Sequence, residues 1–300
     1  MSEPVVGIIG GTGLAEALAG QARPESRDIQ TPFGRPSSPV LLWEWHGLRI
    51  AFLARHGPGH TIPPSAVPFR ANIFALKSLG VTHVLASGAV GSLREEIRPR
   101  HIVVPDQFID RTYRRAGTFF EEGLAVHVEM SRPFCQQLSD RLLSLADGVD
   151  TVIHRGGTYV CMEGPAFSSA AESRLHRAWG GDLIGMTALP EAKLAREAEM
   201  CYALVALVTD YDCWSAEGGH DPHGDQQALL REILGHLRSA TDNAVALLNA
   251  AVADLAKHPP RDCPCRQALQ LAIWSNKNSV DADLVRRLGP LVARYFEGTG

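Results

Sequence analysis

The stretch YALVALVTDYDCW, residues 202–214, decides the fold. Its first seven residues form an uninterrupted apolar run, which is typical of a buried strand. Two carboxylates, Asp210 and Asp212, follow directly and are one residue apart. Carboxylates beside a buried strand are costly to desolvate unless a partner compensates them. A purine that gains a ring proton and donates from an exocyclic amino group would be such a partner, although a pair of Asx turns gives the same pattern.

Strand-like and helical segments alternate outward from this stretch, which predicts one α/β domain with a twisted mixed central sheet flanked by helices. The predicted strands are 5–9, 41–45, 49–53, 81–86, 102–105, 158–161 and 202–208. The predicted helices are 64–79, 135–146, 168–179, 190–200, 226–257 and 281–296. We expect a loop within the domain at 258–260 and a helical C-terminal extension from about 259.

The composition is that of an ordinary globular protein, because 45% of the residues are hydrophobic and 21% are charged. The formal net charge is −4, so a basic surface for nucleic acid or for an anionic membrane is not expected. The apolar run at 5–9 is too short for a signal peptide or a membrane span. We therefore expect a cytoplasmic protein without nucleic-acid or membrane partners.

The chain has six cysteines, at positions 135, 161, 201, 213, 263 and 265. The first four are scattered in apolar surroundings, and we expect them to be reduced core residues. Cys263-Pro264-Cys265 could be a redox pair or half of a metal site, but a second Cys/His pair at zinc spacing does not lie near it in the sequence. A reducing cytoplasm argues against a permanent disulfide. We expect a structural or redox-labile motif and no metal.

Two segments that follow predicted strands have the chemistry of an anion site. The turn Gly10–Gly13 lets backbone N–H groups face one point, and Thr12 adds a hydroxyl. A dinucleotide-binding turn is the alternative, but Glu16 stands where that fingerprint needs Gly or Ala. Arg55 offers a fork of donors for phosphate oxygens, and His56 can donate a further bond or tune the protonation of the anion.

A third turn, SGAVGSLR at 87–94, follows the strand at 81–86. Its small residues permit close approach of the backbone to a ligand, so Gly88 and the N–H of Ala89 are candidate contacts. A tight strand–loop turn explains the same residues equally well.

Two further segments carry candidate contacts for an organic ligand. Phe167, in EGPAFSS at 163–169, could lie against a purine face or anchor the core. Met186, in GMTALPE at 185–191, could pack against a ribose, while Thr187 could bind phosphate near a helix N-terminus. The alternatives are a core methionine and a helix cap.

Taken in order, these segments resemble the 5'-methylthioadenosine phosphorylases of the trimeric purine nucleoside phosphorylase family, over about residues 5–214. The resemblance implies a single nucleoside phosphorylase domain over 1–300 that splits 5'-methylthioadenosine, or a closely related 5'-substituted adenosine, to adenine and a 5-substituted ribose 1-phosphate. It implies a pentosyltransferase of purine and methionine salvage. Inorganic phosphate is the co-substrate, with no metal or organic cofactor, and the assembly is a homotrimer or a hexamer.

The resemblance also assigns roles to residues of this chain. It implies that phosphate is bound by Thr12, Arg55, His56, Gly88, Ala89 and Thr187. It implies that the nucleoside is bound by Phe167, Ser168, Met186, Asp210 and Asp212, and that the two aspartates are catalytic. Relatives that prefer 6-oxopurines usually have Asn for the first aspartate, so the pair favours adenine, whose amino group matches a carboxylate acceptor.

Three departures from the family pattern accompany the match. Gly88 replaces a common Thr, Ala166 replaces a common Arg, and the segment 215–226 is longer and more polar than the usual loop at the 5' pocket, with His220, Asp221 and His223. The 5' substituent therefore stays open at this point.

Other functions are open as well. A purine nucleoside phosphorylase acting on adenosine or 6-oxopurine nucleosides has nearly the same site, a hydrolytic nucleosidase would not need Arg55 and His56, and a non-catalytic nucleotide-binding module would bind without turnover.

Overall fold

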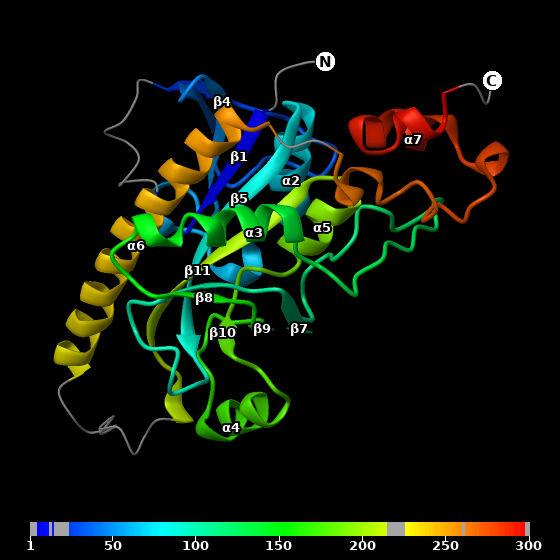
Figure 1. The fold of residues 1–300 in the computed structure, drawn as a ribbon. Helices are drawn as coiled ribbons and strands as arrows, with labels where there is room; N and C mark the ends of the chain where they lie inside the picture. The colour runs from blue at the N-terminus through cyan, green and yellow to red at the C-terminus, as the bar shows by residue number, and fades with distance from the viewer. Residues whose placement is uncertain (1–4, 12–13, 15–23, 215–225, 260–261, 298–300) are drawn as a thin grey trace.

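One mixed, branched sheet organises the computed structural model, which describes residues 5–11, 14, 24–214, 226–259 and 262–297 (Figure 1). The main path of the sheet runs in the order β2 (Glu25–Arg27), β3 (Val40–Trp45), β4 (Leu48–Ala54), β1 (Val5–Gly10), β5 (Val81–Ser92), β10 (Leu183–Gly185), β9 (Thr158–Met162) and β7 (Gln107–Arg111). A branch leaves β5 through β11 (Cys201–Tyr211), β6 (Ile102–Val104) and β8 (Ile153–Arg155). The predicted α/β fold with a mixed central sheet is confirmed.

The apolar run at the start of β11 is buried on both faces, as the sequence pattern predicted. Alternate residues enter two different cores, because successive side chains of a strand point to opposite faces. Leu204 and Val208 belong to the core on one face, and Ala203 and Leu207 belong to the core on the other. β11 is therefore the central strand on which both layers of helices pack.

Helices cover both faces of the sheet (Figure 1). α2 (Phe69–Ser78) and α5 (Glu191–Glu197) contribute to the first core, and α3 (Gln136–Ser144) and α6 (Gln226–Lys257) contribute to the second. α4 (Ala170–Ala178) lies near β9 and β10, and α7 (Ala282–Leu288) belongs to the C-terminal segment. Short 3-10 helices lie at Pro58–His60, Pro64–Ala66, Ala146–Gly148, Pro264–Gln267, Lys277–Ser279, Gly289–Leu291 and Ala293–Tyr295. Among the described helices, none is long and apolar enough to cross a membrane.

Three predicted helices are shorter than the sequence pattern indicated. The helix expected at 64–79 begins at Phe69, because Pro68 keeps the preceding residue, Val67, out of the helical conformation. The helix expected at 190–200 is α5 and ends at Glu197, before Glu199 adopts a φ of 55°. The helix expected at 281–296 ends at Leu288, where Gly289 has a φ of 44° and a proline follows, so the remainder forms 3-10 turns.

Four short strands, β2, β7, β8 and β10, were not predicted. β2, β8 and β10 have three residues each. β7 has five residues, and only two of these five, Phe108 and Ile109, are apolar. Such segments carry too little periodicity to be recognised, and their sheet partners specify them.

The long parallel strands bring the predicted functional segments to one edge. β1 runs parallel to β4 and to β5, and β5 runs parallel to β11, so the carboxyl ends of these strands meet. Ligands of open α/β sheets bind at this edge. Arg55 follows β4, Gly11 follows β1, and Asp212 follows β11.

Candidate active site

A cavity of about 460 Å³ lies at this edge of the sheet. Ten of the eleven predicted site residues line it, from both the phosphate set and the nucleoside set. Thr12 lies outside the described residues, as do His220, Asp221 and His223. The ten are Arg55, His56, Gly88, Ala89, Phe167, Ser168, Met186, Thr187, Asp210 and Asp212.

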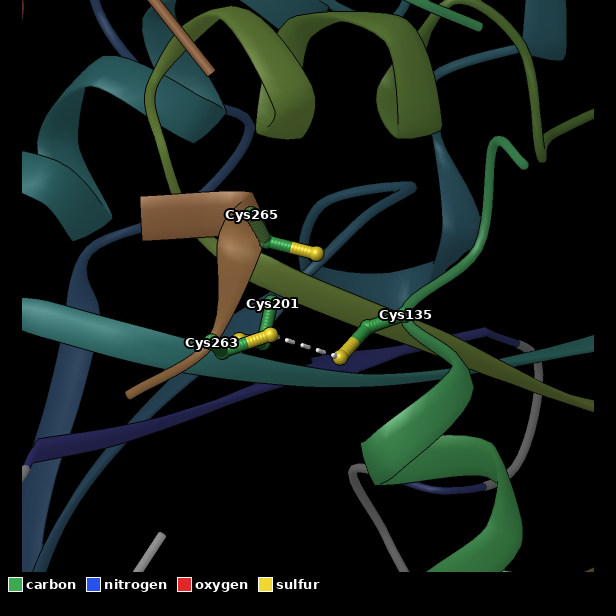
Figure 2. Close-up of side chains that lie close together, drawn as sticks. All are labelled: Cys135, Cys201, Cys263 and Cys265. Atoms are coloured by element: carbon green, nitrogen blue, oxygen red, sulfur yellow. Dashed lines mark hydrogen bonds between the residues drawn. The ribbon is translucent and has the colours of Figure 1, made fainter. Parts of the chain in front are cut away.

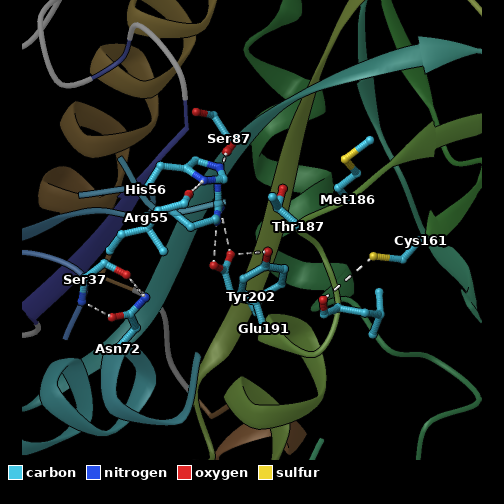
Figure 3. Close-up of polar contacts among 12 residues, drawn as sticks. Ser37, Arg55, His56, Asn72, Ser87, Cys161, Met186, Thr187, Glu191 and Tyr202 are labelled. Atoms are coloured by element: carbon cyan, nitrogen blue, oxygen red, sulfur yellow. Dashed lines mark hydrogen bonds and ion pairs between the residues drawn. The ribbon is translucent and has the colours of Figure 1, made fainter. Parts of the chain in front are cut away.

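Arg55 is fully buried and is held on two sides (Figure 3). Its Nε and Nη2 donate to the two carboxylate oxygens of Glu191 at 2.8 and 2.9 Å, and its Nη1 donates to the carbonyl of Ser87 at 2.7 Å. The hydroxyl of Tyr202 donates to the same Glu191 carboxylate at 2.7 Å. A bidentate pair of this kind fixes the plane of the guanidinium as well as its position.

The electrostatics keep Arg55 charged. Burial by itself would lower the pKa of Arg55, but the Glu191 carboxylate outweighs burial and raises that pKa above its ordinary value. A guanidinium has five N–H groups, and the three bonds above leave donors on Nη1 and Nη2. The site can therefore present an oriented cation donor to an anion in the cavity.

Two glycines allow the backbone to approach Arg55 closely. A Cβ on Gly11 would lie 3.0 Å from the carbonyl oxygen of Ser87 and 3.3 Å from Nη1 of Arg55. A Cβ on Gly88 would lie 3.2 Å from the hydroxyl oxygen of Thr187. Without side chains at these positions, the floor of the cavity is made of backbone, the Thr187 hydroxyl and the Arg55 guanidinium, which is a donor-rich surface suited to an oxyanion.

His56 is neutral and has a defined tautomer. Its Nδ1 lies 2.8 Å from the carbonyl oxygen of Ile62, so Nδ1 carries the proton and Nε2 is an acceptor. Burial lowers the pKa of His56 to about 4, and the neighbouring charge of Arg55 acts in the same direction. The ring of His60, which also lines the cavity, stacks on it at 4.3 Å between centroids.

The two aspartates lie in the same cavity as Arg55, on a turn that is closed by hydrogen bonds. The backbone N–H of Asp212 and the indole N–H of Trp214 both donate to the carbonyl of Ser92, at 3.0 and 2.8 Å. Asp210 accepts from the hydroxyl of Thr209 at 2.5 Å. Oδ2 of Asp212 is buried and has no hydrogen-bond partner within the described residues. A buried carboxylate oxygen needs a donor, and a ligand in the cavity can supply one.

The remaining walls of the cavity are largely apolar. Phe167 is 87% exposed, so its alternative interpretation as a core anchor is wrong. Met186 lines the cavity beside Thr187, and the side chain of Ser168 contacts the sulfur of Met162 at 3.7 Å. Two apolar residues of α6, Ile233 and Leu237, also line the cavity and were not predicted from the sequence.

The residues that hold the site in place were not predicted. Glu191 and Glu163 lie within the predicted motifs but had no predicted role, and Arg115 lies outside those motifs. Nη1 of Arg115 donates to the carbonyls of Met186 and Leu189 at 2.6 and 2.7 Å, and its Nε pairs with Glu163 at 3.1 Å. These contacts fix the loop that carries Thr187, but a charged residue in an irregular segment gives no signal that it is buried.

Comparison with known proteins agrees with this geometry. A family model described as "Phosphorylase superfamily" matches residues 5–253, so the fold and the site define a member of that superfamily. An S-methyl-5'-thioadenosine phosphorylase of Geobacter sulfurreducens is 46% identical over 98% of this chain and 99% of its own length. That of Gloeobacter violaceus is 48% identical over 97% and 95%, respectively.

Solved structures of related enzymes have the same fold as this chain. A methylthioadenosine phosphorylase from an antarctic soil metagenomic library superimposes with a TM-score of 0.87, at 42% identity over 97% of this chain and 99% of its own. A mutant of the adenosine/methylthioadenosine phosphorylase of Schistosoma mansoni, in complex with methylthioadenosine, gives 0.78 at 35% identity, over 85% of this chain and 93% of its own. The chain belongs to the S-methyl-5'-thioadenosine phosphorylase family, and the resemblance read from its motifs is confirmed.

Proposed function

We propose that this protein catalyses phosphorolysis of 5'-methylthioadenosine to adenine and 5-methylthioribose 1-phosphate. One observation carries the proposal: Arg55 and the pair Asp210 and Asp212 line a single cavity, so one nucleoside can lie between an anion and a base-binding turn. Many relatives of similar length that carry this activity in their names support it.

Phosphate occupies the end of the cavity at Arg55. The free N–H groups of Arg55, the hydroxyl of Thr187 and the N–H of Ala89 donate to its oxygens. Thr12, which the family resemblance assigns to phosphate, lies outside the described residues. Because Nδ1 of His56 donates to Ile62, its Nε2 accepts the O–H of monohydrogen phosphate. This acceptor role replaces the donor role that the sequence alone left open for His56.

Adenine occupies the end at the aspartates. Asp212 has an unpartnered buried oxygen, within the described residues, for the exocyclic amino group, and Asp210 gives a proton to N7. Phe167 lies at the mouth of the cavity, where it can close over the base. The carboxylate of Asp212 would leave a 6-keto oxygen facing an acceptor, which discriminates against 6-oxopurines.

The reaction is a displacement at C1' with inversion. The bond from C1' to N9 breaks first, its electrons go to the base, and Asp210 protonates N7. The phosphate charge stabilises the cationic sugar, and a phosphate oxygen then forms the new bond to C1'. The equation balances because the proton of monohydrogen phosphate, once returned to Asp210, is the proton that adenine gains in place of the sugar.

The 5' substituent points at the apolar end formed by α6. Ile233 and Leu237 are one helical turn apart and so share a face of α6, and both line the cavity. The side chain of His236 ties α6 to β11 through the carbonyl of Thr209 at 2.9 Å. An apolar wall favours a methylthio group over the hydroxyl of adenosine.

A panel of nucleosides with and without phosphate tests the proposal. We expect adenine release from methylthioadenosine that requires phosphate and exceeds release from adenosine, with little reaction from inosine. Equal turnover without phosphate would establish a hydrolase, and faster release from inosine would establish a 6-oxopurine phosphorylase. Sedimentation analysis tests the accompanying prediction of a homotrimer.

A further inference from the structure

Four cysteines from three distant segments of the chain meet at the other end of β11 (Figure 2). They come from three segments: Cys135 precedes α3, Cys201 begins β11, and Cys263 and Cys265 flank Pro264 in the C-terminal segment. All four are buried, and their sulfur atoms all lie within 4.8 Å of one another. Cys135 and Cys201 are therefore free core residues, as expected, but they are not scattered, because the fold brings both to the Cys-Pro-Cys motif.

We propose that these four cysteines bind a zinc ion as a structural tetrathiolate site. In tetrahedral zinc sites the Zn–S bonds are about 2.3 Å, which places neighbouring sulfurs about 3.8 Å apart. The sulfurs of Cys135 and Cys263 are 3.6 Å apart. A disulfide requires about 2.05 Å between sulfurs, and all six cysteines of the chain are free. The spacing matches ligands around one ion.

The surroundings suit a dianionic site. Zinc binding replaces four thiol protons, so the centre of one Zn²⁺ and four thiolates carries a net charge of −2. Arg141 lines the same small cavity as Cys135 and Cys201, and Arg266 directly follows Cys265 in the chain, so cationic side chains lie beside the cluster.

The site is closed and lies apart from the cavity. Four protein ligands leave no open position for substrate, which is the mark of a structural zinc site. Cys201 is nine residues before Asp210 on the same strand, or about 30 Å in an extended chain. The ion would fasten the C-terminal segment to α3 and β11. Among the described residues, this is the only group of three or more His, Cys, Asp or Glu side chains placed to hold a metal.

Metal analysis of the full chain, purified with reductant and without added chelator, tests the proposal. We expect about one zinc ion per chain and, after removal with a chelator, rebinding of Zn²⁺ tighter than about 100 nM. Thiol titration should find the four cluster cysteines protected until the chelator is added. Cobalt substitution should give the thiolate-to-metal charge-transfer bands of a sulfur site.

Variants assign the ligands. Cys201→Ser and Cys263→Ser should lose zinc binding, and Cys161→Ser should retain it, because Cys161 is equally buried and free but lies outside the cluster. Should a ligand variant not fold, the stoichiometry and affinity of the unmodified chain still decide. Reduced protein that takes up no zinc, a disulfide within the cluster of the reduced preparation, or iron as the bound metal would each overturn the proposal.

Discussion

The two ends of β11 differ in almost every physical respect. At the end that carries Asp210 and Asp212, an open cavity holds charged and polar groups, one of them a buried carboxylate oxygen without a partner in the described residues. At the end that carries Cys201, four sulfurs face one another in a buried cluster. One end has capacity left for a substrate, whereas the other is complete once a single ion is bound.

The two ends of β11 therefore have different tasks: one binds a substrate, and the other holds segments of the chain together. Groups that must bind and release a ligand keep unsatisfied donors or acceptors. Other side chains hold such groups in position by hydrogen bonds, as Glu191 holds Arg55. Groups that fasten segments together satisfy one another fully. The same strand can serve both tasks because its middle is an apolar core that isolates the two ends.

The largest expected effect is the loss of the proton donor at the cavity end. Asp210→Asn should lower kcat/KM for methylthioadenosine by about 10²–10⁴-fold, the usual contribution of general-acid catalysis. Steady-state assays measure the effect, with Asp242→Asn as the control, because Asp242 is exposed on α6. Activity near the unmodified level in the Asp210 variant would reject its catalytic role.

The next effect concerns the charge behind the cavity. Glu191→Gln removes the counterion of a fully buried arginine, so the free energy of unfolding should fall by about 3–5 kcal/mol. Because phosphate would restore a negative charge beside Arg55, added phosphate should stabilise this variant more than the unmodified chain.

Urea unfolding with and without phosphate measures both quantities. Glu122→Gln, at an exposed position, is the control. If phosphate stabilises both proteins equally, the anion does not lie against Arg55.

Most of the site residues at the cavity end of β11 could be predicted from the sequence. The predicted strands 49–53 and 202–208 end just before Arg55 and His56 and before Asp210 and Asp212, so reading strand ends located these four residues. Thr187 was located from the start of a helix, because the strand before it, β10, was not predicted. Parallel strands then guaranteed a common edge. The roles assigned to these residues stay predictions until they are tested by substitution.

The cysteine end could not be predicted in that way. Its ligands lie on three segments separated by more than sixty residues each, counted from 135 to 201 and from 201 to 263. Only tertiary packing brings them together, and the spacing rules for zinc motifs require pairs close in sequence. The role of Arg115 could not be predicted for a related reason, because its partners are backbone carbonyls of a loop that is distant in the sequence.

A smaller effect is expected from an acid near the cysteine end, at the last turn of α5. Burial raises the pKa of Glu197 to about 7, although the N–H of Phe119 and the hydroxyl of Thr118 donate to it. Because the folded-state pKa exceeds the ordinary value, the protonated form stabilises the fold. This contribution is complete below about pH 4.5, is lost as the pH rises through 7, and amounts to roughly 3 kcal/mol.

Urea unfolding at about pH 5 and about pH 8 measures this contribution. Glu197→Gln cannot ionise, so its stability should decline less over this interval than that of the unmodified chain, and Glu122→Gln should behave like the unmodified chain. Parallel declines in all three proteins would show that Glu197 does not titrate in this range.

The smallest expected effect concerns substrate preference at the apolar wall of the cavity. Leu237→Ala removes contact area from the proposed 5' pocket, so the ratio of kcat/KM for methylthioadenosine to that for adenosine should fall about tenfold. Leu234→Ala is the matched control, because Leu234 lies on the same helix but is 53% exposed and does not line the cavity. The two variants have the same change in side-chain volume and helix propensity. A ratio that falls equally in both, or in neither, would place the 5' substituent away from α6.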